Sequence, residues 1–138
     1  MTFAEVEQAL GQRLATLSPA RPIAWPNKNY DPKASGAVPY IEFAHIPTIK
    51  TDDSIDGSLP VQTGIALLTV VTARDTFANQ ANAIAQAVAD LFPYGVRIET
   101  ANGTVMISKP SDPVAGFTDG IYWRQPVRVT YRTTPAIA

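Results

Sequence analysis

The sequence contains no cysteine and almost no net charge. The absence of cysteine excludes disulfides, thiolate metal sites and thiol nucleophiles together. Its 11 basic and 12 acidic side chains give a formal net charge of -1. The chain as a whole therefore lacks the basic excess that nucleic-acid-binding domains usually carry. The same balance gives no electrostatic attraction to an anionic membrane.

Long hydrophobic runs are also missing. No stretch approaches the roughly 18 consecutive apolar residues that a membrane span needs. The run GIALLTVVTA is too short for a span and is typical of a buried strand. The N-terminus carries acidic side chains early and has helical patterning, so we expect no signal peptide. The length of 138 residues and the hydrophobic content of 46% predict one globular domain over residues 1–138.

Catalytic motifs are equally scarce. There is no H-E-x-x-H, no G-x-S-x-G elbow and no glycine-rich phosphate loop. The single histidine, His45, lies in a strand-like segment between Phe43 and Pro47. We expect it to be a packed or surface residue rather than a general base. The sequence therefore predicts no catalytic, metal or cofactor site, although a small ligand-binding or enzymatic domain stays open as an alternative.

Two amphipathic helices are predicted. The first begins at a capping box formed by Thr2 and Glu5 and ends before Ser18-Pro19. Its apolar face consists of Phe3, Val6, Leu10, Leu14 and Leu17. The second is capped by Asp75 or Thr76 and stops at Pro93-Tyr94-Gly95. Its apolar stripe consists of Phe77, Ala81, Ile84, Ala85, Val88, Leu91 and Phe92.

Six segments are predicted to be strands: residues 22–25, 40–46, 61–72, 96–100, 104–108 and 121–133. Pro47 should end the second strand or confine it to a sheet edge. The third strand carries apolar side chains on both faces. This pattern indicates a central strand that helices, a second layer or a neighbouring subunit cover on both sides. Asn102-Gly103 predicts a hairpin with a two-residue turn.

The order of elements is therefore α-β-β-β-α-β-β-β. This order indicates an α+β domain in which two helices pack on one face of a mixed, mostly antiparallel sheet. The β–α–β crossover around the second helix should be right-handed.

An acidic segment follows the second strand. Asp52, Asp53 and Asp56 cluster within a polar stretch that begins near Lys50. The aspartate cluster matches the pattern of an EF-hand calcium loop only in part, because Ile55 occupies a ligand position and no closing glutamate follows. A metal site, a solvated hairpin loop and a contact loop are the three interpretations. We hypothesise that residues 50–59 are mobile in the monomer and become ordered against a partner.

Three arginines mark the last predicted strand. Arg124, Arg128 and Arg132 are an even number of residues apart and share one strand face. The face opposite carries Ile121, Trp123, Val127, Val129 and Tyr131. The arginine row indicates either a solvated outer face or an electrostatic face toward another subunit or a passing polyanion. An acidic loop and a basic row in one chain would suit head-to-tail self-association.

Trp25 lies next to Pro26 in a proline-rich arm. Beside Ile23, it is expected to anchor this arm on the first helix or on a sheet edge. No convergent polar groups nearby indicate a ligand pocket.

The element order and this opening stretch resemble the tail terminator family of long-tailed bacteriophages and related prophages, also called tail completion or minor tail protein U-like. The resemblance spans most of the chain and lies in the pattern of helices, strands and short residue runs. It rests on the first helix and on three runs that follow it: Pro22-Ile23-Ala24-Trp25-Pro26-Asn27, Tyr30-Asp31-Pro32 and Pro39-Tyr40-Ile41-Glu42-Phe43. It continues through the strand entered at Gly64-Ile65 and the helix with Ala81, Ala85, Ala89 and Leu91-Phe92.

The resemblance implies a structural virion protein rather than an enzyme. Such proteins form a ring, typically hexameric, that caps the tail tube, ends its polymerisation and offers a surface for joining the head. The implied partners are further copies of the chain, the major tail tube protein and the head–tail connector. The resemblance allows DNA to pass through the ring without sequence-specific contact, and it implies no membrane or cofactor. The implied location is the virion tail, assembled in the host cytoplasm. A neighbouring connector or neck protein is the alternative within the virion.

The resemblance also implies a role for each of the two charged groups. Lys50, Asp52, Asp53 and Asp56 would contact the tail tube or an adjacent subunit. Arg124, Arg128 and Arg132 would meet acidic groups across the subunit boundary or line the lumen.

Overall fold

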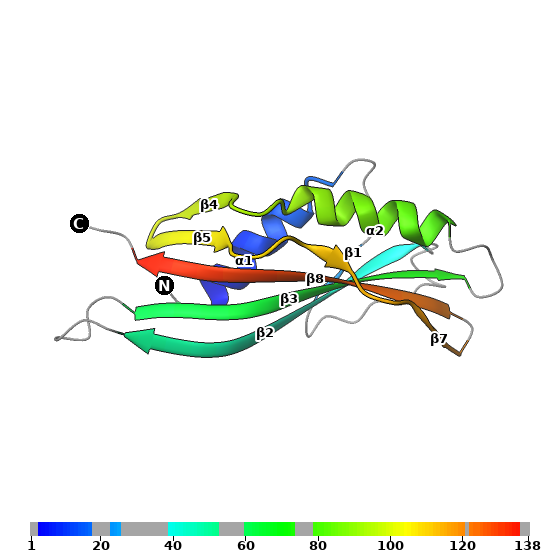
Figure 1. Cartoon of the computed structure of the whole chain (residues 1–138), viewed down its shortest axis with the longest axis horizontal. Helices are drawn as coiled ribbons and strands as arrows, with labels where there is room; N and C mark the ends of the chain where they lie inside the picture. Colours follow the sequence, from blue (N-terminus) through cyan, green and yellow to red (C-terminus); the bar gives the residue numbers. More distant parts are fainter. Residues whose placement is uncertain are drawn as a thin grey trace.

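The computed structural model describes residues 3–17, 23–25, 39–52, 60–73, 79–120 and 122–135. Three long strands, β2 (Tyr40–Asp52), β3 (Pro60–Ala73) and β8 (Tyr122–Pro135), run along the length of the molecule (Figure 1). The shorter strands are β1 (Ile23–Ala24), β4 (Arg97–Thr100), β5 (Gly103–Ile107), β6 (Asp112–Pro113) and β7 (Phe117–Asp119).

The strands form one sheet in the order β1-β2-β3-β8-β5-β4, and β6 and β7 also pair with β8. Only β1 and β2 pair in parallel, and the other pairings among the described strands are antiparallel. The predicted mixed, mostly antiparallel sheet is therefore confirmed, and so is the central place of β3.

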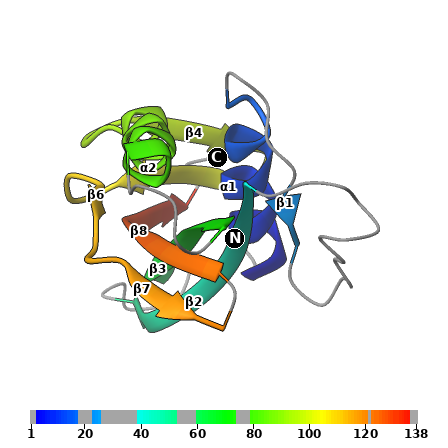
Figure 2. The ribbon, with the colours of Figure 1, turned by 90° about the vertical axis from the view of Figure 1, so that its right-hand side faces the viewer.

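Both helices, α1 (Phe3–Leu14) and α2 (Asn79–Leu91), contribute to one core on one face of the sheet. α2 lies on β3 and β8, whereas α1 contacts both β2 and β4. Since β2 and β4 lie toward opposite edges of the sheet, the sheet must curl around α1, as the end view in Figure 2 shows. The curl gives the sheet an inner face toward the helices and an outer face away from them.

The inner face follows the period of two that strands impose. The even-numbered positions of β3 from Gly64 to Thr72 are buried, and so are the odd-numbered positions of β8 from Gln125 to Thr133. The fully or nearly fully buried residues of the core include Val6, Leu10, Leu14, Ile41, Phe43, Leu68, Val88, Phe92, Val105, Val127, Val129 and Tyr131. The predicted apolar faces of both helices are thus confirmed where they are described. The proposed caps Thr2, Asp75 and Thr76, and also Phe77, lie outside the described residues.

Arg13 joins the C-terminal ends of the two helices. Its Nε donates to the backbone carbonyl of Leu91 at 2.7 Å, and its guanidinium carbon lies 6.0 Å from the ring centroid of Phe92. The last carbonyls of a helix lack intrahelical partners and carry partial negative charge. A cation from α1 therefore satisfies the end of α2.

β2 continues well past Pro47, so the predicted end of the strand at Ile46 was wrong, whereas the alternative prediction of a sheet edge at Pro47 agrees with the pairing. A register shift lies between Pro47 and Ile49, after which pairing with β3 resumes up to Asp52. β1 pairs with β2 only at Ile41 and Glu42, which leaves Pro47 on an edge among the described residues. An edge strand tolerates proline because the missing N–H can face away from the sheet.

The connection before the last strand also differs from the prediction. It contains β6 and β7, so the order of elements is α-β-β-β-α-β-β-β-β-β. β6 is two residues long and β7 is three. Segments this short, in a proline-rich connection, do not show the alternation of apolar and polar residues that predicts a strand. The predicted hairpin is confirmed, but its turn lies one residue earlier than predicted. Thr100 pairs with Gly103 and leaves Ala101 and Asn102 as the two turn residues.

Candidate functional site

The outer face of the sheet carries a group of apolar side chains on β2 and β3. Ile46 pairs with Ile65 across the two strands, and Ala44 pairs with Leu67. Ile46 is 47% exposed and Ile49 is 58% exposed. No helix of the described ranges lies over this face (Figure 2). The sequence predicted that β3 would be covered on both sides. Within the described part of this chain its inner face is covered, whereas on its outer face Val71 is buried and positions 63, 65, 67 and 69 are only half-buried.

A groove of about 740 Å³ lies on the outer face beside these residues. It is lined by Thr48, Thr63, Gly64, Ile65, Ser108, Lys109, Pro110, Asp112, Arg128 and Thr130. We call it the β8 groove. Its lining comes from β2, β3, β6, β8 and the connection between β5 and β6.

A bulge opposite β8 creates the groove. Ile107 pairs with Tyr131, and Asp112 pairs with Arg128. Five residue steps on the β5–β6 side therefore face three steps on β8. The backbone N–H of Ser108 still donates to the carbonyl of Thr130 at 3.0 Å. The surplus falls on Lys109 and the residues after it, which must leave the plane of the sheet.

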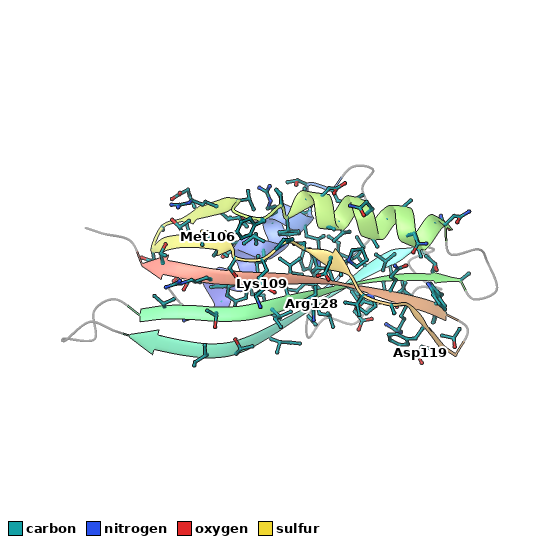
Figure 3. All side chains as sticks on the ribbon, in the orientation of Figure 1. Met106, Lys109, Asp119 and Arg128 are labelled. Carbon is teal, nitrogen blue, oxygen red and sulfur yellow. The ribbon has the colours of Figure 1, made fainter. Side chains whose placement is uncertain are left out.

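The β8 groove is mainly cationic and rich in hydroxyl groups. Lys109 is exposed, and Arg128 lies 3.6 Å from the carboxylate of Asp112 with half of its side chain exposed. Thr48, Thr63, Ser108 and Thr130 add hydroxyls, of which the first two lie 3.1 Å apart. Figure 3 shows Lys109 and Arg128 beside one another near the middle of β8, with Met106 toward one end of the molecule and Asp119 toward the other. Lys109 has no signal in the local sequence, since only the bulge brings it next to the arginine row.

The three arginines share the outer face, as the period of β8 predicts, but they differ in environment. Arg124 is paired with the carboxylates of Glu42 and Asp119, the latter at 2.7 Å. Burial opposes the charged form of Arg124, yet these two carboxylates outweigh it and raise its pKa. Arg132 is exposed, and no ion pair is found for it in the part of the chain that the structure describes. Of the three, Arg124 is the one held by two carboxylates, whereas Arg128 has the single, longer contact with Asp112 and stays half exposed.

The acidic group is only partly described. Lys50 and Asp52 belong to β2 and pair with Gln62 and Pro60 of β3, so their assignment to a loop was wrong. Asp53 and Asp56 lie outside the described residues. Among the residues that are described, no three histidine, cysteine, aspartate or glutamate side chains gather as a metal site would require.

His45 lies in the interior, in the curl between β2 and α1. Its Nε2 and the hydroxyl of Tyr131 are 2.5 Å apart, and its Nδ1 lies 4.0 Å from Oε1 of Glu7. The His45 side chain has no exposed surface. Burial lowers the pKa of His45 and raises the pKa of Tyr131 to about 12. The expectation of a packed histidine is confirmed. No pattern in the sequence indicated its partners Glu7 and Tyr131, because both are distant in the chain.

Trp25 anchors the segment that follows α1. Its ring centroid lies 5.9 Å from that of Phe43 on β2. A Cβ added to Gly11 of α1 would lie 2.9 Å from Cζ3 of the same ring. Trp25 was predicted to pack on the first helix or on a sheet edge, and it contacts both α1 and β2. The arm that follows it, residues 26–38, lies outside the described residues.

Neither of the two described helices is long and apolar enough to cross a membrane.

A family model for phage tail terminator proteins matches residues 5–131. This chain belongs to the phage tail terminator family. It is therefore a structural protein of the phage tail and of the virion. No curated protein matches the sequence.

Solved structures share the fold of this terminator. One, of a protein without a descriptive name, is 21% identical, with a TM-score of 0.73 over 98% of this chain and 93% of that chain. Another belongs to the virion of a native gene transfer agent particle. It is 16% identical, with a TM-score of 0.64 over 98% of this chain and all of that chain (100%).

Proposed function

We propose that this terminator closes the end of the tail tube as a ring of identical subunits, hexameric in the assembled tail. The ring ends tube polymerisation and provides the surface to which the head is joined. Its partners are other copies of the chain, the major tail tube protein and the head–tail connector, and DNA passes through it without sequence-specific contact. Assembly takes place in the host cytoplasm.

The exposed outer face of β2 and β3 carries this proposal. A central strand that is apolar on both faces is suited to burial on both sides. Here the helices cover only the inner side, and Ile46 and Ile49 remain about half exposed. Contiguous exposed apolar surface marks a protein interface. In a ring, one surface of each subunit meets a different surface of the next, and the contacts close.

Polymerisation of purified major tail protein in the presence of increasing amounts of the terminator tests the proposal. Tube length and tube ends would be measured by electron microscopy. We expect shorter tubes, each carrying one ring of added density at a single end. Tubes of unchanged length, together with binding to the purified connector, would instead support the alternative of a neck protein.

A further inference from the structure

We propose that the β8 groove binds the acidic segment of a neighbouring copy of this chain, residues 52–56. The inference rests on the proposed ring, because it names a contact by which one subunit would hold the next. It assigns a receptor role to Lys109 and Arg128, and a ligand role to Asp52, Asp53 and Asp56.

The charges of the two surfaces are complementary. The groove lining carries two cations, Lys109 and Arg128, against one carboxylate, Asp112. Arg132 lies further along the outer face of β8 and is also exposed. The segment carries three carboxylates within five positions. Complementary charges of this kind steer association and fix the register of an interface.

The apolar and polar parts of the groove also fit a peptide. Ile65 and Pro110 supply apolar surface, and Ser108 and Thr130 supply hydroxyl donors for carboxylate oxygens. The sequence around the three aspartates contains Ile55 and Leu59. A segment that combines acidic and apolar side chains matches a groove that combines cations with apolar walls.

The direction of the hairpin favours a second copy as the source of the segment. Asp52 pairs with Pro60 at the far end of β2 and β3, whereas the groove begins at Thr48 and Thr63. At about 3.3 Å per residue, this places Asp52 roughly 13 Å beyond the groove along the strands. The backbone of β2 therefore leads away from the groove of its own subunit as it reaches Asp52, which favours a contact with the groove of another copy.

Nucleic acid fits the groove less well than this segment does. The net charge of the chain is -1, and Asp112 inside the groove would repel a phosphate. Proteins that bind single strands add aromatic side chains on which bases stack. None of the ten described lining residues is aromatic.

A binding measurement on the isolated full chain tests the contact. A labelled peptide of residues 49–60 is titrated into the protein at concentrations where light scattering shows a monomer. We expect saturable binding, weakened about tenfold or more when the three aspartates of the peptide are asparagines. Lys109→Glu and Arg128→Glu should each weaken binding similarly. Arg97→Glu is the matched control, since Arg97 is an exposed cation on β4 outside the groove.

Three results would overturn the proposal. The first is equal binding of the acidic and the amide peptides. The second is a monomeric wild-type chain that rejects the peptide while its own triple Asp→Asn variant accepts it, because the segment would then occupy its own groove. The third is a short duplex DNA that competes for the groove and is lost in Lys109→Glu.

A charge-reversal experiment tests the same contact in the assembled state. One variant carries Lys109→Glu with Arg128→Glu, and the other carries Asp52→Lys, Asp53→Lys and Asp56→Lys. Each alone should fail to cap tail tubes while unfolding thermally like the wild type. A mixture of the two should recover capping, since pairing the two variants restores opposite charges at the boundaries between them.

The outcomes separate this inference from the proposed function. If the wild type caps tubes and both variants also cap them, the groove contact is wrong and the terminator function stands. If the wild type does not cap tubes but the peptide binds as expected, the proposed function fails and the contact between copies stands.

Discussion

Tyr131 lies directly across from Gly64 on the neighbouring strand, and its ring crosses over this glycine. A Cβ at position 64 would lie 2.5 Å from the Tyr131 hydroxyl and 2.7 Å from Cζ. Because glycine leaves this space open, the hydroxyl reaches past β3 to His45 on β2. The pair thereby links the middle of β8 to the edge of the sheet beneath α1.

Gly64→Ala should destabilise the protein. The added methyl group would overlap the buried ring of Tyr131, and it would also lie 2.9 Å from the backbone carbonyl oxygen of Ile46. Overpacking of this kind costs about 1–3 kcal/mol. Urea unfolding measures the effect. The cost should shrink in a Tyr131→Leu background, which removes Cζ and the hydroxyl, and an undiminished cost there would contradict the explanation.

The buried histidine predicts a loss of stability in mild acid. Burial lowers the pKa of His45 below its ordinary 6.5, although Glu7 lies nearby. The unfolded chain then binds this proton at a higher pH than the folded chain does. Stability from this group is complete above about pH 6.5 and falls as the pH drops below it, by at most about 1.4 kcal/mol per pH unit.

His45→Asn should flatten this dependence in urea unfolding measured from about pH 7 to pH 5. Tyr131→Phe is the control, because it removes the hydroxyl partner but keeps the titrating imidazole. The pKa of Tyr131, about 12, keeps the wild-type hydroxyl protonated throughout this range. Equal pH slopes in the wild type and in His45→Asn would show that carboxylates alone cause the acid sensitivity.

Arg124 and Arg132 should respond differently to the same substitution. Arg124→Gln breaks the pairs with Glu42 and Asp119, which join β2, β8 and β7. We expect a loss of about 1 kcal/mol in the free energy of unfolding, since both carboxylates are half exposed and solvent screens the pairs. Arg132→Gln on the exposed part of the row should stay within about 0.5 kcal/mol of the wild type. Equal losses would mean that the row acts as one unit.

Local patterns in the sequence predict most of the fold. The period of α1 and α2 identifies Val6, Leu10 and Val88 as buried, and the alternation along β8 separates Val127 and Val129 from Arg128. These features depend only on near neighbours in the chain. Pro47 misled the assignment of β2 because its effect depends on whether the strand is at an edge, which the pairing of distant segments decides.

The candidate site is harder to predict for the same reason. The arginine row follows from one strand, but the β8 groove depends on the register of β5 and β6 against β8. That register places Lys109 beside Arg128, whereas carboxylates on β2 and β7 hold Arg124. No spacing within one segment contains this information.

The apolar outer face predicts that assembly can be lost without loss of the fold. Ile46→Ser and Ile49→Ser remove side chains that are 47% and 58% exposed, so the free energy of unfolding should change by no more than about 0.5 kcal/mol each. Capping of tail tubes should need about tenfold more protein, because each isoleucine would be buried in the interface. Tyr94→Ser is the control, since Tyr94 is 67% exposed in the turn between α2 and β4. If the control weakened capping as much as the isoleucine variants did, the outer face would have no special part in assembly.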